Sequence, residues 1–266
     1  MTFRAGAVLA LALLLAACTS APGNPRSTAT EGTAGTSGSP SVAPTPAPGA
    51  PVEGEEAGDT DPFEPTAVRT RFAGRILSPL PAHLLREMRG ETWHAGCPVP
   101  LNDLALLRFN YRGFDGEVKR GPMVVNASVA RDVLGVFRTL FHADFPIRHV
   151  ALAKRFRPNA DPDSRGSVTA SFNCRPIVTP AGPGDRFSMH AYGLAVDINS
   201  LQNPYVASDG YTRNRFARPY RDRSLDLPGM IHPGDVVVRA FTEIGWEWGG
   251  DWNSGKDYMH FSSNDR

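Results

Sequence analysis

The stretch SMHAYGLAVDIN (188–199) places His190 and Asp197 on either side of a small apolar run. Residues an odd number of positions apart point to opposite faces of a straight strand. The two side chains therefore converge only if the chain turns or bulges between them, and Gly193 is the residue that permits such a turn. Taken alone, the stretch fits either a strand that carries two polar residues or one half of a metal site.

A second polar group lies close to the C-terminus, in GWEWGGDW (245–252) and DYMHF (257–261). Together, His190, Asp197 and His260 supply the nitrogen and oxygen ligands typical of a catalytic zinc site, in which water takes the fourth position. The site contains no cysteine, and this argues against a closed structural zinc site. The sequence therefore predicts one Zn²⁺ ion held by these three side chains.

The spacing S-x-H-x-x-G-x-A-x-D, followed by W-G-G-D-W and D-x-x-H-F, resembles the D-alanyl-D-alanine carboxypeptidase family of zinc peptidases, of the VanY and phage-endolysin type. Three further segments look like parts of its secreted bacterial branch. They are GCPVPLNDLALLRFNYRGFDG (96–116), FPIRHVAL (145–152) and SFNCRPI (171–177). The resemblance covers roughly residues 94–262.

The resemblance implies a role for each residue that matches the family motif. His190, Asp197 and His260 would bind zinc, and Asp257 would be the general base and acid, where many relatives have Glu. Arg175 would steady the carbonyl oxygen as it becomes an oxyanion, and Ser188 would help to hold the substrate. The family also implies an α+β fold of the hedgehog and D-Ala-D-Ala peptidase kind.

The chemistry of peptide hydrolysis asks for the same roles. Positive charge near the carbonyl oxygen stabilises the tetrahedral anion, and a carboxylate near the reacting water accepts its proton and passes it to the leaving amine. Glu247 and Asp251 are rivals of Asp257 for that second role, because the sequence fixes no distances.

The function that follows is zinc-dependent hydrolysis of peptide bonds in peptidoglycan stem peptides, with the terminal D-Ala-D-Ala bond as the expected target. One alternative keeps the site and changes the bond, to an L-Ala-D-Glu or cross-link endopeptidase. The other alternative is a non-catalytic, zinc-containing cell-wall-binding module, because the hedgehog superfamily includes such domains. The presence of both Asp257 and Arg175 favours the enzyme.

The N-terminal residues predict export. Residues 1–18 have Arg4, an apolar run and small residues before Cys18, as in a bacterial lipoprotein signal. Lipidation of Cys18 would place the protein outside the cytoplasm, anchored to the bacterial cell membrane; the alternative is an ordinary cleaved signal. Residues 19–70, rich in Pro, Gly, Ser, Thr and Ala, predict a disordered linker, and residues 71–266 the zinc peptidase domain.

Charge separates the linker from the domain. Residues 19–66 hold seven acids and one base, so that residues 67–266 carry 26 bases and 20 acids. A mildly basic exported domain suits an anionic partner such as the cell wall. No basic and aromatic stripe of the nucleic-acid-binding kind is present, and we expect a monomer that meets the membrane through its lipid anchor only.

The remaining polar and aromatic residues are expected to be structural, or the sequence leaves their role open between two alternatives. Cys97 and Cys174 form either one disulfide or two buried thiols. The three tryptophans of GWEWGGDW line a substrate cleft or belong to the core. Five histidines have no acidic or histidine partner at a suggestive spacing: His83, His94, His142, His149 and His232.

Apolar spacing and turn residues predict a few helices and several short strands. Residues 126–146 indicate a helix with Ser128 as its cap, and residues 232–246 a second helix capped by Asp235 and ended by Gly245. Strands are expected at 105–111, 123–126, 148–153 and 194–199, and around Trp246 and His260. This pattern predicts an α+β fold with a mainly antiparallel sheet.

Overall fold

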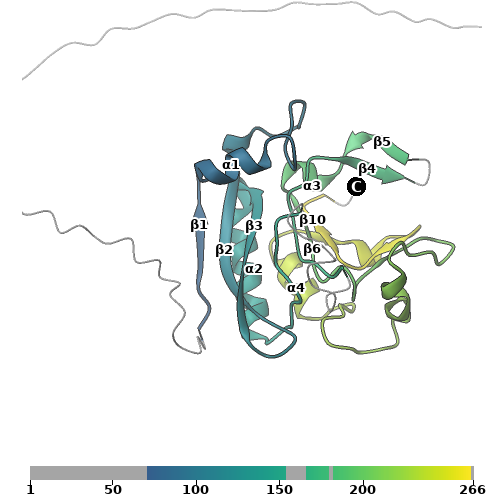
Figure 1. Cartoon of the computed structure of the whole chain (residues 1–266). Coiled ribbons are helices and arrows are strands. Elements are labelled where there is room, and N and C mark those ends of the chain that lie inside the picture. The colour runs from purple at the N-terminus through teal and green to yellow at the C-terminus, as the bar shows by residue number, and fades with distance from the viewer. Residues whose placement is uncertain (1–70, 154–165, 180–181, 265–266) are drawn as a thin grey trace, which may run out of the picture. The chain divides into compact units, whose positions relative to one another are not determined.

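The first sheet is built around a hairpin of two nine-residue strands. In a computed structural model, which describes residues 71–153, 166–179 and 182–264, β2 (Leu104–Arg112) and β3 (Val118–Asn126) make an antiparallel hairpin. β1 (Gly74–Leu77) pairs with β2, which gives the order β1-β2-β3 (Figure 1). The signal peptide, Cys18 and the linker predicted for residues 1–70 lie outside the described residues.

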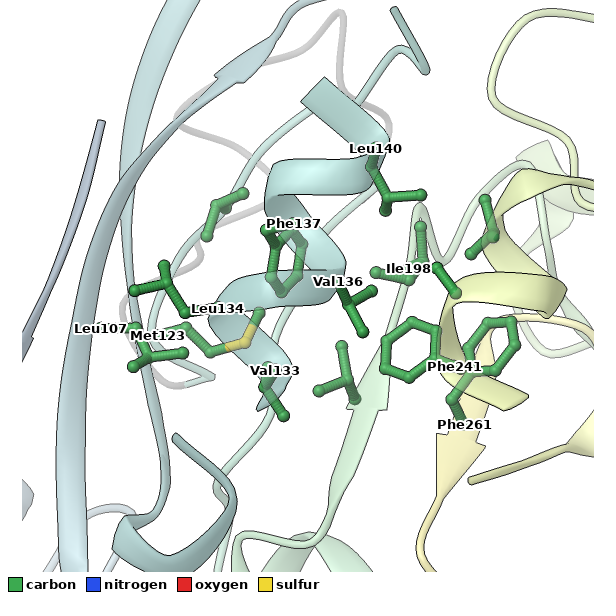
Figure 2. Packing of buried hydrophobic residues seen from close by; sticks show 14 of the residues in the cluster. Leu107, Met123, Val133, Leu134, Val136, Phe137, Leu140, Ile198, Phe241 and Phe261 are labelled. Atoms are coloured by element: carbon green, nitrogen blue, oxygen red, sulfur yellow. The ribbon is translucent and has the colours of Figure 1, made fainter. Parts of the chain in front are cut away.

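Both faces of this sheet are covered by apolar side chains. Alternate residues of a strand point to opposite faces, and Leu107 and Phe109 belong to one buried cluster while Leu104 and Leu106 belong to another. The first cluster lies on the side of α2 (Ala130–His142), whose Phe137 ring stacks on Phe109 (Figure 2). The second cluster is completed by α1 (Ala82–Met88) and by residues 172 and 174.

The cap of α2 differs from the sequence prediction. The predicted cap, Ser128, lies inside a 3-10 turn, η2 (Ala127–Val129), and its hydroxyl donates to Asn126 Oδ1 at 2.7 Å. Asn126, the last residue of β3, accepts from Ser128 N as well. The Ser128 hydroxyl is therefore used within the turn, and the side chain of Asn126 caps that turn instead.

The second sheet has the order β6-β10-β8 and packs against α4 (Val236–Glu243). Its strands are β6 (Ala195–Asp197), β10 (His260–Ser262) and β8 (Glu247–Trp248). As predicted, Asp235 caps α4 by accepting from the N–H groups of its second and third residues. Stacked rings of Phe241 and Phe261 join helix and sheet, and Figure 2 shows α2 between the two sheets.

The remaining elements are short. They are η1 (Leu101–Asp103), β4 (Pro176–Thr179), β5 (Gly182–Phe187), α3 (Met189–Tyr192), β7 (Tyr205–Val206), η5 (Arg215–Arg221), η6 (Gly249–Asp251) and β9 (Lys256–Asp257). β4 pairs with β5, and β7 pairs with β9. Within the described ranges, no helix is long and apolar enough to cross a membrane.

The predicted fold class is confirmed, because every pair of strands is antiparallel and helices cover the sheets. The strand predicted at 148–153 is wrong. In the described residues this segment makes one isolated bridge, between Val150 and Thr169, and the N–H of Arg148 donates to the side chain of Asn199. β1, β4 and β5 were not predicted.

Candidate metal centre

The turn between His190 and Asp197 is made by a short helix and one glycine. His190 lies in α3, and its own N–H donates to the capping side chain, Ser188 Oγ. Gly193 ends the helix in the left-handed region, with φ 68° and ψ 23°, and the chain then reverses into β6. This conformation brings a helical histidine and a strand aspartate to one place, as the sequence requires.

The same glycine is pressed against the first sheet. Its carbonyl accepts from Asn126 N at 2.9 Å, and a methyl group added at Gly193 would lie 2.5 Å from that backbone nitrogen. We expect Gly193→Ala to lower the free energy of unfolding by more than about 2 kcal/mol, since left-handed strain and backbone overlap add together. Urea unfolding measures this loss.

Gly135→Ala is the matched control for that substitution. Gly135 lies within α2, and a methyl group there would meet no atom within 4 Å. This variant should gain about 0.5–1 kcal/mol, the usual benefit of alanine in a helix. Equal stability of the two variants would contradict the strained turn at Gly193.

Three predicted ligands meet around one carboxylate oxygen. Asp197 and His260 are direct partners in the β6–β10 pair, and Asp197 Oδ1 lies 3.1 Å from His260 Nδ1 and 3.2 Å from His190 Nε2. One ligand atom from each side chain lies within 4.8 Å of the other two. His190 and His260 are buried and Asp197 is half-buried. The donor set fits a divalent cation such as zinc.

A backbone carbonyl fixes the ring of His190. His190 Nδ1 lies 2.8 Å from the carbonyl oxygen of Ser171. A carbonyl oxygen only accepts, so Nδ1 carries a proton, which leaves Nε2 as the ring atom that faces Asp197 and the candidate metal position. This is the arrangement that supports a metal-binding histidine. Sequence reasoning missed Ser171, because a carbonyl group belongs to every residue and leaves no signal.

Asp197 is ionised at neutral pH. Burial alone would raise the pKa of Asp197, but the charge of His190 and the hydrogen bonds of both imidazoles hold it well below its usual range. A permanently negative carboxylate between two ring nitrogens attracts a cation. The electrostatics of the cluster therefore agree with its ligand geometry.

The carboxyl of Asp257 has a raised pKa, in contrast to that of Asp197. Burial first, and then the negative charge of Asp197, raise its pKa to about 7, although His260 and Arg175 oppose that rise. Its Oδ1 atom is buried and has no hydrogen-bond partner within the part of the chain that the structure describes. A methyl group at Gly249 would lie 2.6 Å from the Asp257 carbonyl oxygen, so this glycine lets β9 approach η6 closely. Asp257 is thus a carboxyl that can both accept and release a proton near neutral pH.

The raised pKa of Asp257 predicts a pH dependence of the metal-free protein. A carboxyl whose folded pKa is raised gives stability below its unfolded value of about 4, and that stability is lost as pH rises through about 7. Without metal, Asp257→Asn should therefore remove part of the fall in melting temperature between about pH 5 and pH 8. Melting curves with chelator would contradict this if both proteins showed the same slope.

Arg175 and Ser188 lie on the two chain segments that flank the cluster. Arg175 is half-buried, its charge lowers the pKa of Asp257, and its carbonyl accepts from Ser188 N at 3.1 Å. Ser188 is buried and its Oγ accepts from His190 N at 3.4 Å. The hydroxyl predicted to hold substrate therefore also caps α3.

The other candidates fall into three groups. Trp246 and Trp248 are buried in the core, whereas the Trp252 ring lies 5.6 Å from the His260 ring, beside the metal centre. Glu247 and Asp251, the rival bases, have exposed side chains. Cys97 and Cys174, for which the sequence left two alternatives, are joined by a disulfide, so their sulfur atoms are not metal ligands although His94 lies near them.

Comparison with known proteins agrees with the resemblance seen in the sequence. Residues 181–263 match the model of a family described as D-alanyl-D-alanine carboxypeptidase. Comparisons with curated proteins and with solved structures give no match. The matched residues include all three candidate ligands, Ser188 and Asp257, while Ser171, Arg175 and both cysteines lie outside them. The family resemblance predicted from the sequence is confirmed for residues 181–263, and this family of peptidases is zinc-dependent.

Proposed function

We propose that this protein is a zinc peptidase that hydrolyses the terminal D-Ala-D-Ala bond of peptidoglycan stem peptides. The observation that carries the proposal is the convergence of His190, Asp197 and His260 beside a buried carboxyl whose pKa is raised to about 7. The family match supports hydrolysis of peptide bonds. The particular bond is inferred from the family description.

The metal would be held by His190 Nε2, a carboxylate oxygen of Asp197 and His260 Nδ1. A bound Zn²⁺ ion supplies Lewis acidity toward a carbonyl group and lowers the pKa of water. The carbonyl of Ser171 keeps the His190 ring in the orientation that this requires.

The chain's own groups would supply the proton transfers. Asp257 accepts a proton from the reacting water and later gives it to the leaving amine, and a pKa near neutrality serves both steps. The guanidinium of Arg175 adds positive charge where the carbonyl oxygen becomes an anion. Ser188 would contact the substrate through its hydroxyl proton, since its oxygen already accepts from His190 N.

Defined muropeptides test the proposal. The full chain is incubated with a pentapeptide stem, a tetrapeptide stem and a cross-linked dimer, with zinc or with a chelator, and the products are read by mass. We expect zinc-dependent loss of one alanine from the pentapeptide alone. Cleavage of the dimer, or within the tetrapeptide, would assign an endopeptidase. Loss of no residue from any substrate would overturn the peptidase and favour a wall-binding module.

We further propose that the enzyme works outside the cytoplasm, anchored by a lipid on Cys18, with residues 19–70 as the linker. A long linker would let an anchored enzyme reach an insoluble polymer. Cell fractionation tests the anchor: the protein is expected with the membranes, and Cys18→Ser should release it. Recovery of both forms in the soluble fraction would overturn the anchor.

A further inference from the structure

Residues 171–175 contact the metal centre at three points, although they lie outside the family match. The carbonyl of Ser171 accepts from His190 Nδ1 at 2.8 Å, and Asn173 N donates to the His190 carbonyl at 3.1 Å. The carbonyl of Arg175 accepts from Ser188 N at 3.1 Å. One short segment therefore orients a ligand ring, holds the backbone of that ligand and carries the predicted oxyanion residue.

This supporting segment (171–175) belongs to no helix or strand. Phe172 N donates to Val124 O, and Cys174 N donates to Thr92 O. The Phe172 and Cys174 side chains are buried in the cluster that α1 completes. Isolated hydrogen bonds hold an irregular segment less firmly than a strand ladder would, so its attachment elsewhere decides how well it is placed.

That attachment is covalent. The disulfide joins Cys174 to Cys97, which lies 77 residues earlier in the loop after α1. Cys174 directly precedes Arg175 and lies three residues after Ser171. The disulfide therefore anchors the segment between Ser171 and Arg175, the two residues that serve the metal centre. At this point the chain passes from the buried cluster of α1 to that centre.

We propose that the Cys97–Cys174 disulfide is a positioning element of the metal centre, so that the protein reaches full metal affinity and turnover only when the disulfide is formed. The part of the proposal that concerns turnover rests on the proposed peptidase function. The part that concerns metal affinity rests on the contact of Ser171 with His190 alone. An exported enzyme of this kind becomes active only after it has left a reducing compartment.

The proposal differs from a plain contribution to stability. A disulfide that closes a long loop stabilises a folded protein wherever it lies. A positioning role predicts more, namely that a protein still folded without the bond binds zinc more weakly and has a lower kcat with a similar KM. Loss of support behind a ligating histidine typically costs 10- to 100-fold in metal affinity or activity.

The test removes the bond in two ways. One is the variant Cys97→Ala/Cys174→Ala; the other is reduction of the wild-type chain by a water-soluble phosphine, which gives two thiols and a phosphine oxide whose oxygen comes from water. Zinc affinity is measured by competition with a chromophoric chelator, and kcat and KM are measured on the pentapeptide stem. Circular dichroism shows that each sample is folded at the assay temperature.

We expect kcat to fall by at least about tenfold in both samples, and zinc affinity to fall as much in the double variant. Histidine NMR should also show that His190 loses the fixed Nδ1–H form. If folded protein without the disulfide keeps wild-type kcat, and the folded double variant keeps wild-type zinc affinity, the proposal is overturned. If the double variant does not fold, the reduced wild-type chain gives kcat and the histidine NMR signal, since its free thiols beside His94 would bind zinc themselves.

Leu84→Ala is the control, because Leu84 is buried in the same cluster and lies far from the segment in sequence. It should lower the melting temperature and leave zinc affinity and kcat within about twofold of wild type; equal losses in this variant would overturn the positioning role. Should the wild-type chain cleave no stem peptide, the proposed function fails. The zinc-affinity comparison then still decides whether the disulfide positions the ligand.

Discussion

Asp197→Asn should abolish hydrolysis and weaken zinc binding by more than about 100-fold. The carboxylate is the shared neighbour of both imidazoles, with one oxygen 3.1 and 3.2 Å from their nitrogens. Asparagine keeps the shape but removes the negative charge that binds the cation. The effect should exceed that of losing an outer hydrogen-bond partner, which costs about 10- to 100-fold. Isothermal titration with zinc and the pentapeptide assay measure both losses.

Asp185→Asn is the matched control for this change. Asp185 is exposed on β5, so its substitution removes the same negative charge at a position away from the centre. It should bind zinc and turn over as the wild type does. The metal-free proteins offer a second check. A carboxyl with a lowered pKa contributes stability above about pH 4 that is lost in acid, so acid should destabilise Asp197→Asn less than the wild type. Wild-type zinc affinity in Asp197→Asn would exclude this residue as a ligand.

Asp257→Asn should lower kcat by about 10²- to 10⁴-fold while zinc remains bound. This is the usual contribution of a positioned general acid and base, and asparagine neither accepts nor releases a proton at this pH. The ligands are unchanged in the variant, so metal affinity should stay within about tenfold of wild type. A pH–rate profile should lose the limb that belongs to this carboxyl.

Two substitutions on neighbouring residues provide the control. Glu247→Gln and Asp251→Asn remove the rival carboxylates, whose side chains are exposed. Both carboxylates lie open to water, so each variant should retain kcat within about twofold. If Asp257→Asn retained zinc and full turnover while either control lost it, the rival would be the proton carrier.

The convergence of His190, Asp197 and His260 was predictable because their residue types and spacing carry the signal. Histidine and aspartate bind zinc through particular atoms, and a glycine between them marks the turn that both need. The two longer helices were predictable for a similar reason, since their apolar residues repeat at three and four over two turns or more. An apolar pattern of this length identifies a helix even where single residues would fit either a helix or a strand.

The supporting parts of the site could not be predicted in the same way. Ser171 acts through its carbonyl group, and α3, β8 and β9 are too short for any periodicity to show. The failed strand at 148–153 shows the other limit. Its apolar residues fit a strand, but within the described part of the chain the segment makes only one bridge, to Thr169, and the N–H of Arg148 is bound by the side chain of Asn199, about fifty residues away.

The pairing of His260 with Asp197 across β6 and β10 would give a bound metal ion a part in folding. A shift of the register by one residue would turn these side chains to opposite faces and separate the ligands. Strands of three residues fix their own register weakly, whereas a cation binds only the arrangement that gathers its ligands. Zinc present while the chain folds would therefore favour the native alignment of the second sheet over its slipped alternatives.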